Sequence, residues 1–435
     1  MAALSTHSLK VIVVGAGPAG LCAAAALRQH GHAVTVLERQ RGLQSQGNAL
    51  VIQPAAVKAL SHLRGAHAAL DAVSVRSDRL CYWSYRGDAP FATTDLLDRR
   101  FETDRPSVQR VLYELAVADG VEVQFGRNIE HVEDQGHKAT LRTSDGQVLE
   151  GDVIVAADGI KSRVRACLFP QRNTDPIPLR ESIFLATLPV SQLQANPDLA
   201  GWLAPGTTHG TLGPGRFVLS RPLHGGQYGV QFIDVDHADP GPVDGTWNAP
   251  ADVSRLRALF ADFNPITRAC LREIERAEKW QIAVGPALDT WRSGNGGRVV
   301  LLGDAAHAMI PHAAQGLSQG IEDGISLARM LSGGGGGGGG ASVGAVTEAW
   351  ERMRKPRAEL FVQRSMNNAR LRSLPDGAAQ AARDEQIVRS AGRKPQDARD
   401  VKMDMGADQN SPEFMKWVRE YDVVAEAERT MKDIL

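Results

Sequence analysis

The stretch of sequence that decides the fold runs from Lys10 to Arg39 and reads KVIVVGAGPAGLCAAAALRQHGHAVTVLER. It starts with a short β-branched run, passes through a glycine-rich turn into an alanine-rich segment, and ends in a second β-branched run. β-Branched residues favour strands, and alanine favours helix. Strand, turn, helix and strand within about 30 residues predict one βαβ unit.

The glycine spacing in this turn is that of a loop that binds a dinucleotide. Gly15 permits the tight turn, Gly17 lets the backbone approach a pyrophosphate, and Gly20 lets helix and strand pack closely. The helix that follows, with Ala19 in its first turn, presents unpaired N–H groups and a partial positive charge to the phosphates. The alternative is a glycine-rich turn that binds nothing.

Three strand ends in the sequence carry an acidic residue. Glu38 closes the βαβ unit and can accept hydrogen bonds from ribose hydroxyls, and Arg39 beside it is a candidate contact to the adenine or a phosphate. Asp158 and Asp304 each follow the pattern of a buried strand. An acid at such a place can bind a polyol chain, which FAD has and NAD lacks. The three motifs together therefore favour FAD.

The composition is that of an ordinary globular protein and excludes several classes of function. Of the 435 residues, 43% are hydrophobic and 23% are charged, and the net charge of -1 selects neither nucleic acid nor an anionic membrane as partner. The four cysteines form no CxxC pair, and His307 and His312 lack a carboxylate at metal-ligand spacing, so we expect no metal site. Because no leader and no apolar stretch of about 18 residues is found, we expect a cytoplasmic protein that does not enter a membrane.

Strand and helix signals divide the chain into three regions. Short strands between proline and glycine turns predict a mostly antiparallel sheet that binds substrate, and the end of the chain is predicted to be helical. The predicted regions are a discontinuous FAD-binding domain of residues 8–174 and 290–332 (with 70–105 as a candidate contribution to the second domain), a substrate domain of residues 175–289, and a C-terminal helical region of residues 341–435.

Three further patterns concern packing and flexibility. Gly320 and Gly324 each lower the propensity of a predicted helix by about 1 kcal/mol, which close packing against another segment would explain. The run 333–340 is all glycine and predicts a flexible linker. An apolar stripe near the end of the chain is typical of core or dimer packing, and it consists of Phe414, Trp417, Val418 and Tyr421.

In their order and separation, the glycine loop and the Asp158 and Asp304 motifs resemble those of the class A FAD-dependent aromatic monooxygenases, which have the para-hydroxybenzoate hydroxylase fold. The chain is most similar to the salicylate hydroxylase-like branch, and the resemblance covers roughly residues 8–370. It implies an α/β fold in which a Rossmann-like FAD-binding domain is interwoven with a mostly antiparallel β-sheet substrate domain, followed by C-terminal helices. A homodimer is an expectation from the family alone.

The resemblance also implies a role for individual residues in FAD binding. Asp304 would hold the ribityl hydroxyls, Asp158 would act in FAD and NAD(P)H binding, and Arg110 would lie near the pyrophosphate. The helix after Gly316 would aim its positive end at the flavin, where reduction places negative charge. The remaining residues implied by the resemblance are Glu38, Ala49 in the segment 47–50, and Pro311 and Leu317 beside the isoalloxazine ring.

The same resemblance implies the chemistry. No second glycine motif is present, so NADPH or NADH would bind only transiently, as a co-substrate that reduces FAD. O2 would then give a flavin C4a-hydroperoxide, which transfers one oxygen atom to an electron-rich ring of a phenolic, salicylate-like or indole-type substrate. The alternatives are a flavin-dependent reductase or dehydrogenase on the same fold, and a non-catalytic FAD-binding protein.

Candidate residues on the substrate side come from the predicted sheet and the loop after Pro311. Tyr228 is a candidate to project into the pocket, although a strand tyrosine in the core is the alternative. Arg221 could hold a carboxylate with two hydrogen bonds, although a surface arginine is the alternative. His312 could transfer a proton or simply pack, and His307 is expected to brace its loop. Further candidate contacts are His209, His224 and Gln231.

Overall fold

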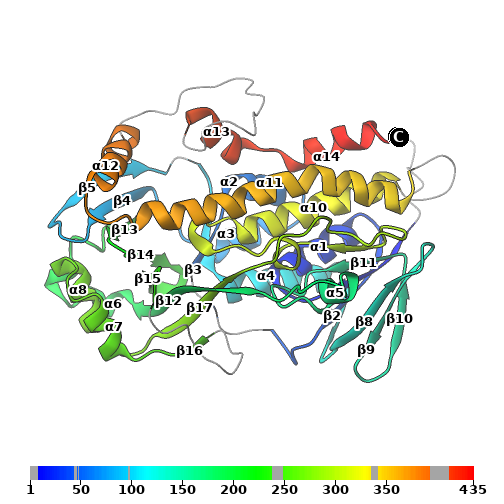
Figure 1. Ribbon diagram of the computed structural model, residues 1–435, viewed down its shortest axis with the longest axis horizontal. Helices are drawn as coiled ribbons and strands as arrows, with labels where there is room; N and C mark the ends of the chain where they lie inside the picture. Colours follow the sequence, from blue (N-terminus) through cyan, green and yellow to red (C-terminus); the bar gives the residue numbers. More distant parts are fainter. Residues whose placement is uncertain are drawn as a thin grey trace.

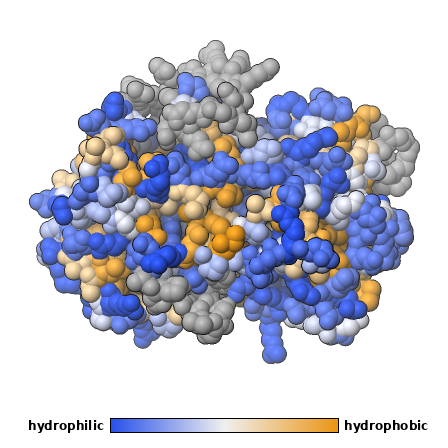
Figure 2. Space-filling model, viewed as in Figure 1, coloured by the Kyte–Doolittle hydropathy of each residue, from blue (hydrophilic) through white to orange (hydrophobic). Residues whose placement is uncertain are grey.

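A computed structural model describes residues 8–43, 47, 49–96, 98–237, 248–334, 341–391 and 411–435. The described elements confirm the predicted α/β fold with two large sheets and C-terminal helices (Figure 1). In the orientation of Figure 2 the surface is mostly hydrophilic, with hydrophobic residues gathered near the middle of this face. The division of the chain into three domains stays a prediction.

The first large sheet has five parallel strands and carries the predicted βαβ unit. Its strands, in spatial order, are β18 (Val299–Leu301), β11 (Val153–Ala156), β1 (Lys10–Val14), β2 (Ala33–Glu38) and β7 (Glu122–Phe125). Carboxyl ends of parallel strands lie at one edge of a sheet. The glycine loop, Asp158 and Asp304 therefore meet at this edge.

The second large sheet has eight strands and is antiparallel apart from one pair, β13 with β4. Two of its strands, β4 and β5, fall within residues 70–105. In spatial order the strands are β16 (Asn248–Pro250), β17 (Glu278–Val284), β12 (Ile177–Pro189), β15 (Gln227–Asp234), β14 (Arg216–Leu223), β13 (Thr207–Gly213), β4 (Arg79–Ser84) and β5 (Pro90–Asp95). Two smaller antiparallel sheets consist of β8 (Ile129–Asp134), β9 (Ala139–Thr143) and β10 (Val148–Gly151), and of β3 (Ala49–Ile52) and β6 (Phe101–Asp104).

The two faces of the eight-stranded sheet differ. One face packs against three short helices and contributes Tyr228, Val230 and Phe232 to their common core. We call it the helix-covered face, and its helices are α6 (Val190–Gln194), α7 (Val253–Leu259) and α8 (Pro265–Glu273). Alternate residues of a strand point to opposite faces. Accordingly, Gln231 of β15 points away from these helices and donates a hydrogen bond to the carbonyl oxygen of Ala49 in β3, at 3.3 Å. We call this second face the site face.

Helices surround the five-stranded sheet and continue to the C-terminus. Two long helices, α10 and α11, lie side by side through the middle of the molecule, and α13 and α14 lie along them (Figure 1). Besides α6, α7 and α8, the described helices are α1 (Pro18–Gln29), α2 (Pro54–Leu60), α3 (Ala66–Ala72), α4 (Arg105–Ala118), α5 (Arg163–Leu168), α9 (Asp304–His307), α10 (Gly316–Gly334), α11 (Val343–Arg372), α12 (Ala378–Ala391), α13 (Pro412–Glu420) and α14 (Val423–Lys432).

The apolar stripe near the C-terminus packs inside the protein, as one of its two interpretations predicted. Phe414 and Val418 are buried against residues of α11. Trp417 and Tyr421 place their rings over the guanidinium group of Arg357, at 4.4 and 3.9 Å. Of the all-glycine run, residues 335–340 lie outside the described part of the chain, so its role as a linker stays a prediction.

Helices α1 and α10 approach each other closely at Gly320 and Gly324, the two glycines that lower the helix propensity of α10. A Cβ added to Gly320 would lie 2.8 Å from the Cβ of Ala19. A Cβ added to Gly324, one turn later, would lie 2.9 Å from the backbone of Ala23. Real Cβ atoms do not make such short contacts, so the two helices can pack this closely only because both positions are glycine. The explanation by close packing is confirmed.

Gly324→Ala should destabilise the protein although alanine is the better helix former. The neighbour at 2.9 Å is backbone, which cannot move aside, so the helices would have to separate. We expect overpacking to lower the free energy of unfolding by about 1–3 kcal/mol, measured by urea unfolding. The control is Gly333→Ala in the same helix, where the nearest atom, Cε of Met431, is 3.5 Å away and the change should not destabilise. Equal stability of Gly324→Ala and the wild type would contradict the packing argument.

Candidate functional site

The three glycines of the loop after β1 have different surroundings. Gly15 has a φ of +105°, and an added Cβ would lie 2.4 Å from the carbonyl oxygen of Ala157. An added Cβ at Gly20 would lie 2.1 Å from the carbonyl oxygen of Gly15. An added Cβ at Gly17 would meet no heavy atom within 4 Å. Gly15 and Gly20 are therefore required by the packing of the protein, whereas Gly17 borders open space.

Glu38 and Gln109 hold the glycine loop from two sides. The Glu38 carboxylate accepts hydrogen bonds from the backbone N–H groups of Ala16 and Gln40, both at 2.8 Å. The amide of Gln109 on α4 donates a 2.7 Å hydrogen bond to the carbonyl oxygen of Ala16. Sequence reasoning missed Gln109, because a glutamine within a helix carries no motif. Arg39, the other candidate at the end of β2, is exposed.

In α4, Arg105 rather than the predicted Arg110 lies on the face that contacts the glycine loop. Arg110 is exposed and lies one residue beyond Gln109. Arg105 lies one helical turn before Gln109 and so shares the face that contacts the glycine loop. A Cβ added to Gly47 would lie 2.8 Å from the Cβ of Arg105, so this arginine also adjoins the segment 47–50. Of that segment, Asn48 lies outside the described residues. We add Arg105 to the candidates for holding FAD.

The Asp158 carboxylate is occupied by the protein itself. It accepts hydrogen bonds from the Ser162 hydroxyl at 2.5 Å and from the backbone N–H groups of Arg163 and Val164 at 2.8 and 3.1 Å. Burial raises the pKa of Asp158, although these hydrogen bonds oppose the shift. Asp158 therefore caps the start of α5 and shapes its loop, and its side chain has few positions left for a ligand.

Asp304, by contrast, is exposed at the carboxyl end of β18. Its loop is tied to the Asp158 loop by the buried Arg165, which donates to the carbonyl oxygen of Ala305 at 3.0 Å and to that of Ile160. A carboxylate that is exposed at a buried strand end can accept hydrogen bonds from the hydroxyls of a bound molecule.

The segment 311–315, which lies between α9 and α10, contacts the eight-stranded sheet, and we call it the flavin-side loop. It contains a short 3-10 turn and a left-handed residue, Ala314, with a φ of +50°, and α10 then begins at Gly316, with Leu317 next. The buried His312 contacts Glu181 of β12, with Nε2 and Oε1 2.5 Å apart. The carbonyl oxygen of His312 accepts a 2.8 Å hydrogen bond from Arg372 of α11. His312 thus has a packing role, and its role in proton transfer stays a prediction.

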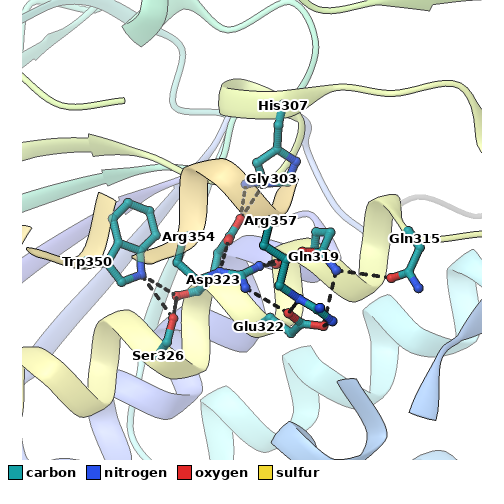
Figure 3. Close-up of polar contacts among 10 residues, drawn as sticks. All are labelled: Gly303, His307, Gln315, Gln319, Glu322, Asp323, Ser326, Trp350, Arg354 and Arg357. Carbon is teal, nitrogen blue, oxygen red and sulfur yellow. Dashed lines mark hydrogen bonds and ion pairs between the residues drawn. The ribbon is translucent and has the colours of Figure 1, made fainter. Parts of the chain in front are cut away.

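A buried network of charged and polar side chains anchors the Asp304 loop to α10 and α11 (Figure 3). Asp323 accepts hydrogen bonds from the backbone N–H of Gly303 at 3.0 Å and from Arg354 at 2.9 Å, and its Oδ2 lies 2.6 Å from Nε2 of His307. Glu322 next to it accepts from Arg354 and Arg357, at 2.9 and 2.8 Å. His307 therefore braces its loop, as the sequence suggested.

Charges within the network set the protonation of Asp323. Burial by itself would raise the pKa of Asp323, but the charges of His307 and Arg354, with the hydrogen bonds from His307 and from the backbone of Gly303, outweigh it and lower the pKa to about 2. The carboxylate therefore stays ionised at every pH at which the protein would work.

The predicted substrate contacts fall on both faces of the sheet. The expectation that Tyr228 projects into the pocket is not met: it lies on the helix-covered face, buried, with its hydroxyl 3.1 Å from that of Ser220. Burial raises the pKa of Tyr228, so its hydroxyl stays protonated and does not supply a phenolate base. His209 lies on the same face and bonds to Trp83 and to the carbonyl oxygen of Trp202, at 3.0 and 2.7 Å.

Arg221 and Gln231, in contrast, belong to the site face. The Arg221 side chain is 14% exposed, and its Nη1 lies 3.8 Å from the carboxylate of Glu102 in β6. Arg221 is therefore not a surface arginine. His224 is exposed in the turn after β14.

These surroundings fit an FAD molecule. Gly17 leaves room for a pyrophosphate beside the N-terminus of α1, Asp304 presents an exposed carboxylate to a ribityl chain, and the start of α10 at Gly316 presents backbone N–H groups. The glycine loop, the end of β18 and the start of α10 lie at one edge of the parallel sheet, where ligands of such sheets bind. Fold and site together define a flavin-dependent oxidoreductase.

The comparison with protein families agrees with this class. A family model described as the FAD binding domain matches residues 8–365, and the chain belongs to this family. The FAD-dependent monooxygenase OpS4 of Beauveria bassiana is 28% identical over 430 residues, covering 97% of this chain and 96% of that protein. The 3-amino-4-hydroxybenzoate 2-monooxygenase of Streptomyces cremeus is 30% identical over 395 residues, covering 88% and 92%. The chain is thus an FAD-dependent monooxygenase, an enzyme of the oxidoreductase class.

Solved structures show the same fold. A salicylate hydroxylase in complex with its substrate has a TM-score of 0.80 to this chain at 21% identity and covers 98% of both chains. FqzB has a TM-score of 0.79 at 24% identity, covering 99% of this chain and 96% of that one. The resemblance to class A flavin hydroxylases that the sequence motifs indicated is confirmed.

Two negative findings apply to the part of the chain that the structure describes. No helix there is long and apolar enough to cross a membrane. The same residues contain no group of three or more histidine, cysteine and acidic side chains arranged to hold a metal ion.

Gly17→Val should separate folding from cofactor binding. Gly17 has an extended backbone conformation that valine can adopt, and the added side chain would meet nothing in the protein. It would occupy the space next to the phosphates, and a clash of about 1–3 kcal/mol corresponds to a loss of FAD affinity of roughly 5- to 150-fold. Flavin fluorescence titration measures the affinity, and thermal unfolding of the apoprotein should show little change. Unchanged FAD affinity would contradict the proposed position of the pyrophosphate.

Asp323→Asn should destabilise the protein far more than loss of a surface ion pair. It leaves Arg354 buried with one negative partner fewer, which costs about 3–5 kcal/mol, measured by urea unfolding. The control is Glu428→Gln, which removes the exposed partner of Arg329 on the same helix, where about 0–1 kcal/mol is expected.

The same variant tests how the stability of the protein depends on pH. Because the pKa of Asp323 is lower in the folded than in the unfolded protein, its contribution to stability is present above about pH 4 and is lost as the pH falls towards 2. Asp323→Asn should therefore flatten this part of the curve of stability against pH. A curve as steep as that of the wild type would contradict the assignment.

Proposed function

We propose that this enzyme uses NADPH or NADH and O2 to insert one oxygen atom into an aromatic substrate bound between the flavin-side loop and the site face of the eight-stranded sheet. The overall reaction consumes O2, NAD(P)H and one proton, places one oxygen atom on the ring and releases the other as water. FAD, when bound and reduced, supplies the C4a-hydroperoxide chemistry of this transfer.

The observation that carries the proposal is the direct attachment of the flavin-side loop to the site face. His312 of the loop contacts Glu181 of β12, and its ring lies 5.1 Å from that of Phe217 in β14 in an edge-to-face arrangement. Phe217 of the site face is thereby held beside the loop that leads into α10, and Arg221 lies on the same face of the same strand. A ring bound there would lie beside the flavin, as oxygen transfer requires.

The residues of this chain would have distinct tasks in that reaction. Asp304, Gly17 and the N-terminus of α10 would hold FAD, and the positive helix end would favour the negative charge of its reduced form. The His312–Glu181 pair would keep the loop against the sheet and exclude water from the reacting centre. Arg221 and Gln231 would orient the substrate.

The names of relatives support an aromatic substrate. Relatives of this chain are named as monooxygenases of 3-amino-4-hydroxybenzoate and of 6-hydroxynicotinate, the latter from Pseudomonas fluorescens at 27% identity over 336 residues. Both names describe a hydroxylated ring with an acid group. An electron-rich ring of this kind is what an electrophilic oxygen donor needs.

The decisive experiment follows NADH and NADPH oxidation in air by the FAD-loaded protein with a panel of phenolic acids, phenols and indoles. We expect one class of compound to stimulate oxidation and to gain one oxygen atom, which carries the label when 18O2 is supplied. Gly17→Val serves as the matched control, since it should fold but lose both FAD and turnover. Turnover that is as fast without O2, with an unlabelled product, would instead identify a flavin-dependent reductase.

A further inference from the structure

The helix-covered face of the eight-stranded sheet contains a cavity that the proposed function does not use. It lies between α7, the strands β16, β17 and β12, and the end of β15, and its volume is about 740 Å³. Cavities of about 300–1,000 Å³ are of the size that binds small molecules. Because Phe184, which lines it, belongs to the core of the helix-covered face, this cavity and the proposed substrate position lie on opposite faces of the sheet. We call it the α7 cavity.

The walls of the α7 cavity are mostly apolar and partly aromatic. Phe184 of β12, Ala249 of β16 and Leu259 of α7 line it. The Phe184 ring lies 5.5 Å from that of His237 in an edge-to-face arrangement, a geometry in which aromatic rings attract one another. Such walls favour a flat, apolar ligand whose orientation is fixed by a few polar groups.

One buried polar pair faces this apolar lining. Asp234 and His237, at the end of β15, both line the cavity and are only 8% and 6% exposed. Nδ1 of His237 lies 2.8 Å from Oδ2 of Asp234, which leaves Nε2 as the ring nitrogen without a hydrogen bond to any described residue. An imidazole that a carboxylate orients in this way can exchange a hydrogen bond with a hydroxyl group. The pair could therefore bind the hydroxyl group of a ligand.

The charged side chains of the cavity do not require a charged ligand. Asp236 pairs with Arg180, Arg216 donates to Asp262 at 3.0 and 2.9 Å, and Asp252 caps the start of α7. Among the described lining residues, basic side chains and carboxylates balance each other, and they are Arg216, Arg255, Lys279, Asp234, Asp236 and Asp252. A neutral molecule can bind here without a charge that these groups must compensate. A phenol, with a pKa of about 10, is neutral at physiological pH.

The buried pair is attached to the strand that holds the flavin-side loop. The backbone N–H of His237 donates a 2.8 Å hydrogen bond to the carbonyl oxygen of Arg180, and the next residue, Glu181, contacts His312. The pairing of β12 with β17 is interrupted at residues 179–181, so hydrogen bonds to β17 do not hold this segment in place. The position of Glu181 therefore depends on contacts such as the one that His237 makes.

We propose that the α7 cavity is an effector site for a neutral aromatic molecule that carries a hydroxyl group. A ligand that packs on Phe184 and binds His237 holds the segment that carries Glu181, and so favours the arrangement in which the flavin-side loop is in place. FAD then has less of the loop left to order, so the ligand and FAD should each bind more tightly when the other is bound. The proposal needs only FAD binding and does not rest on the proposed function.

Binding is measured by equilibrium dialysis of the FAD-loaded protein with 2-naphthol and with its methyl ether, which cannot donate a hydrogen bond. Ala258→Trp on α7 and Ala249→Trp on β16 each fill the cavity from a different wall. At saturation we expect each variant to bind one molecule of 2-naphthol per chain fewer than the wild type. The cavity should bind the ether several-fold more weakly than 2-naphthol. Ala261→Trp, at an exposed position that follows α7 and does not line the cavity, is the control and should bind like the wild type.

The connection to the flavin-side loop is measured by titrating FAD into the apoprotein, followed by flavin fluorescence, with and without saturating 2-naphthol. The wild type and Ala261→Trp should bind FAD at least about 5-fold more tightly when 2-naphthol is present. Ala258→Trp and Ala249→Trp should lose this gain while still binding FAD, and thermal unfolding confirms that each variant is folded.

Each part of the proposal can be contradicted separately. Equal binding of 2-naphthol by the wild type and both cavity variants would overturn the site. A gain in FAD affinity that is absent from the wild type, or that both cavity variants retain, would overturn its role as an effector site. Neither measurement involves O2 or NAD(P)H, so a failure of the protein to oxygenate any ring would contradict only the proposed function.

Discussion

The close approach of α1 and α10 is the constraint on which the rest of the structure depends. Gly320 faces Ala19 and Gly324 faces Ala23, so the two helices run in the same direction and start at the same end. One start lies at the glycine loop and the other at the flavin-side loop. Two helix N-termini, each with a partial positive charge, are thereby brought to one edge of the parallel sheet. A side chain at either glycine would disturb both at once.

The buried network extends this arrangement to the third part of the cofactor site. Asp323 adjoins Gly324 on α10 and accepts the backbone N–H of Gly303, so the helix that packs on α1 also holds the loop that carries Asp304. Replacing buried ion pairs by apolar side chains often costs no stability. The network is better explained as a means of positioning the helices, because its hydrogen bonds fix where α9, α10 and α11 meet.

Sequence reasoning predicts those parts of the candidate site that depend on local patterns. The βαβ unit, the three glycines, Asp304 and the start of α10 each depend on a few neighbouring residues. Tyr228 shows the limit: alternation along β15 predicts that it shares a face with Val230 and Phe232 but does not say which face of the sheet meets β3. Gln109 and Glu181 were missed for the same reason, since only the tertiary fold brings them next to the glycine loop and the flavin-side loop.

Why the sequence predicts some site residues and misses others follows from how each ligand would be held. The candidate FAD site consists largely of backbone, namely glycines that permit close approach and the ends of helices, and two of its glycines, Gly15 and Gly20, are also required by the packing of the protein. On the proposed substrate side, the candidate residues are side chains that project from strands, where exchanging one polar residue for another leaves α1 and α10 in place. Substrate preference can therefore change by substitution without loss of the cofactor site, and relatives at about 30% identity need not share a substrate with this enzyme.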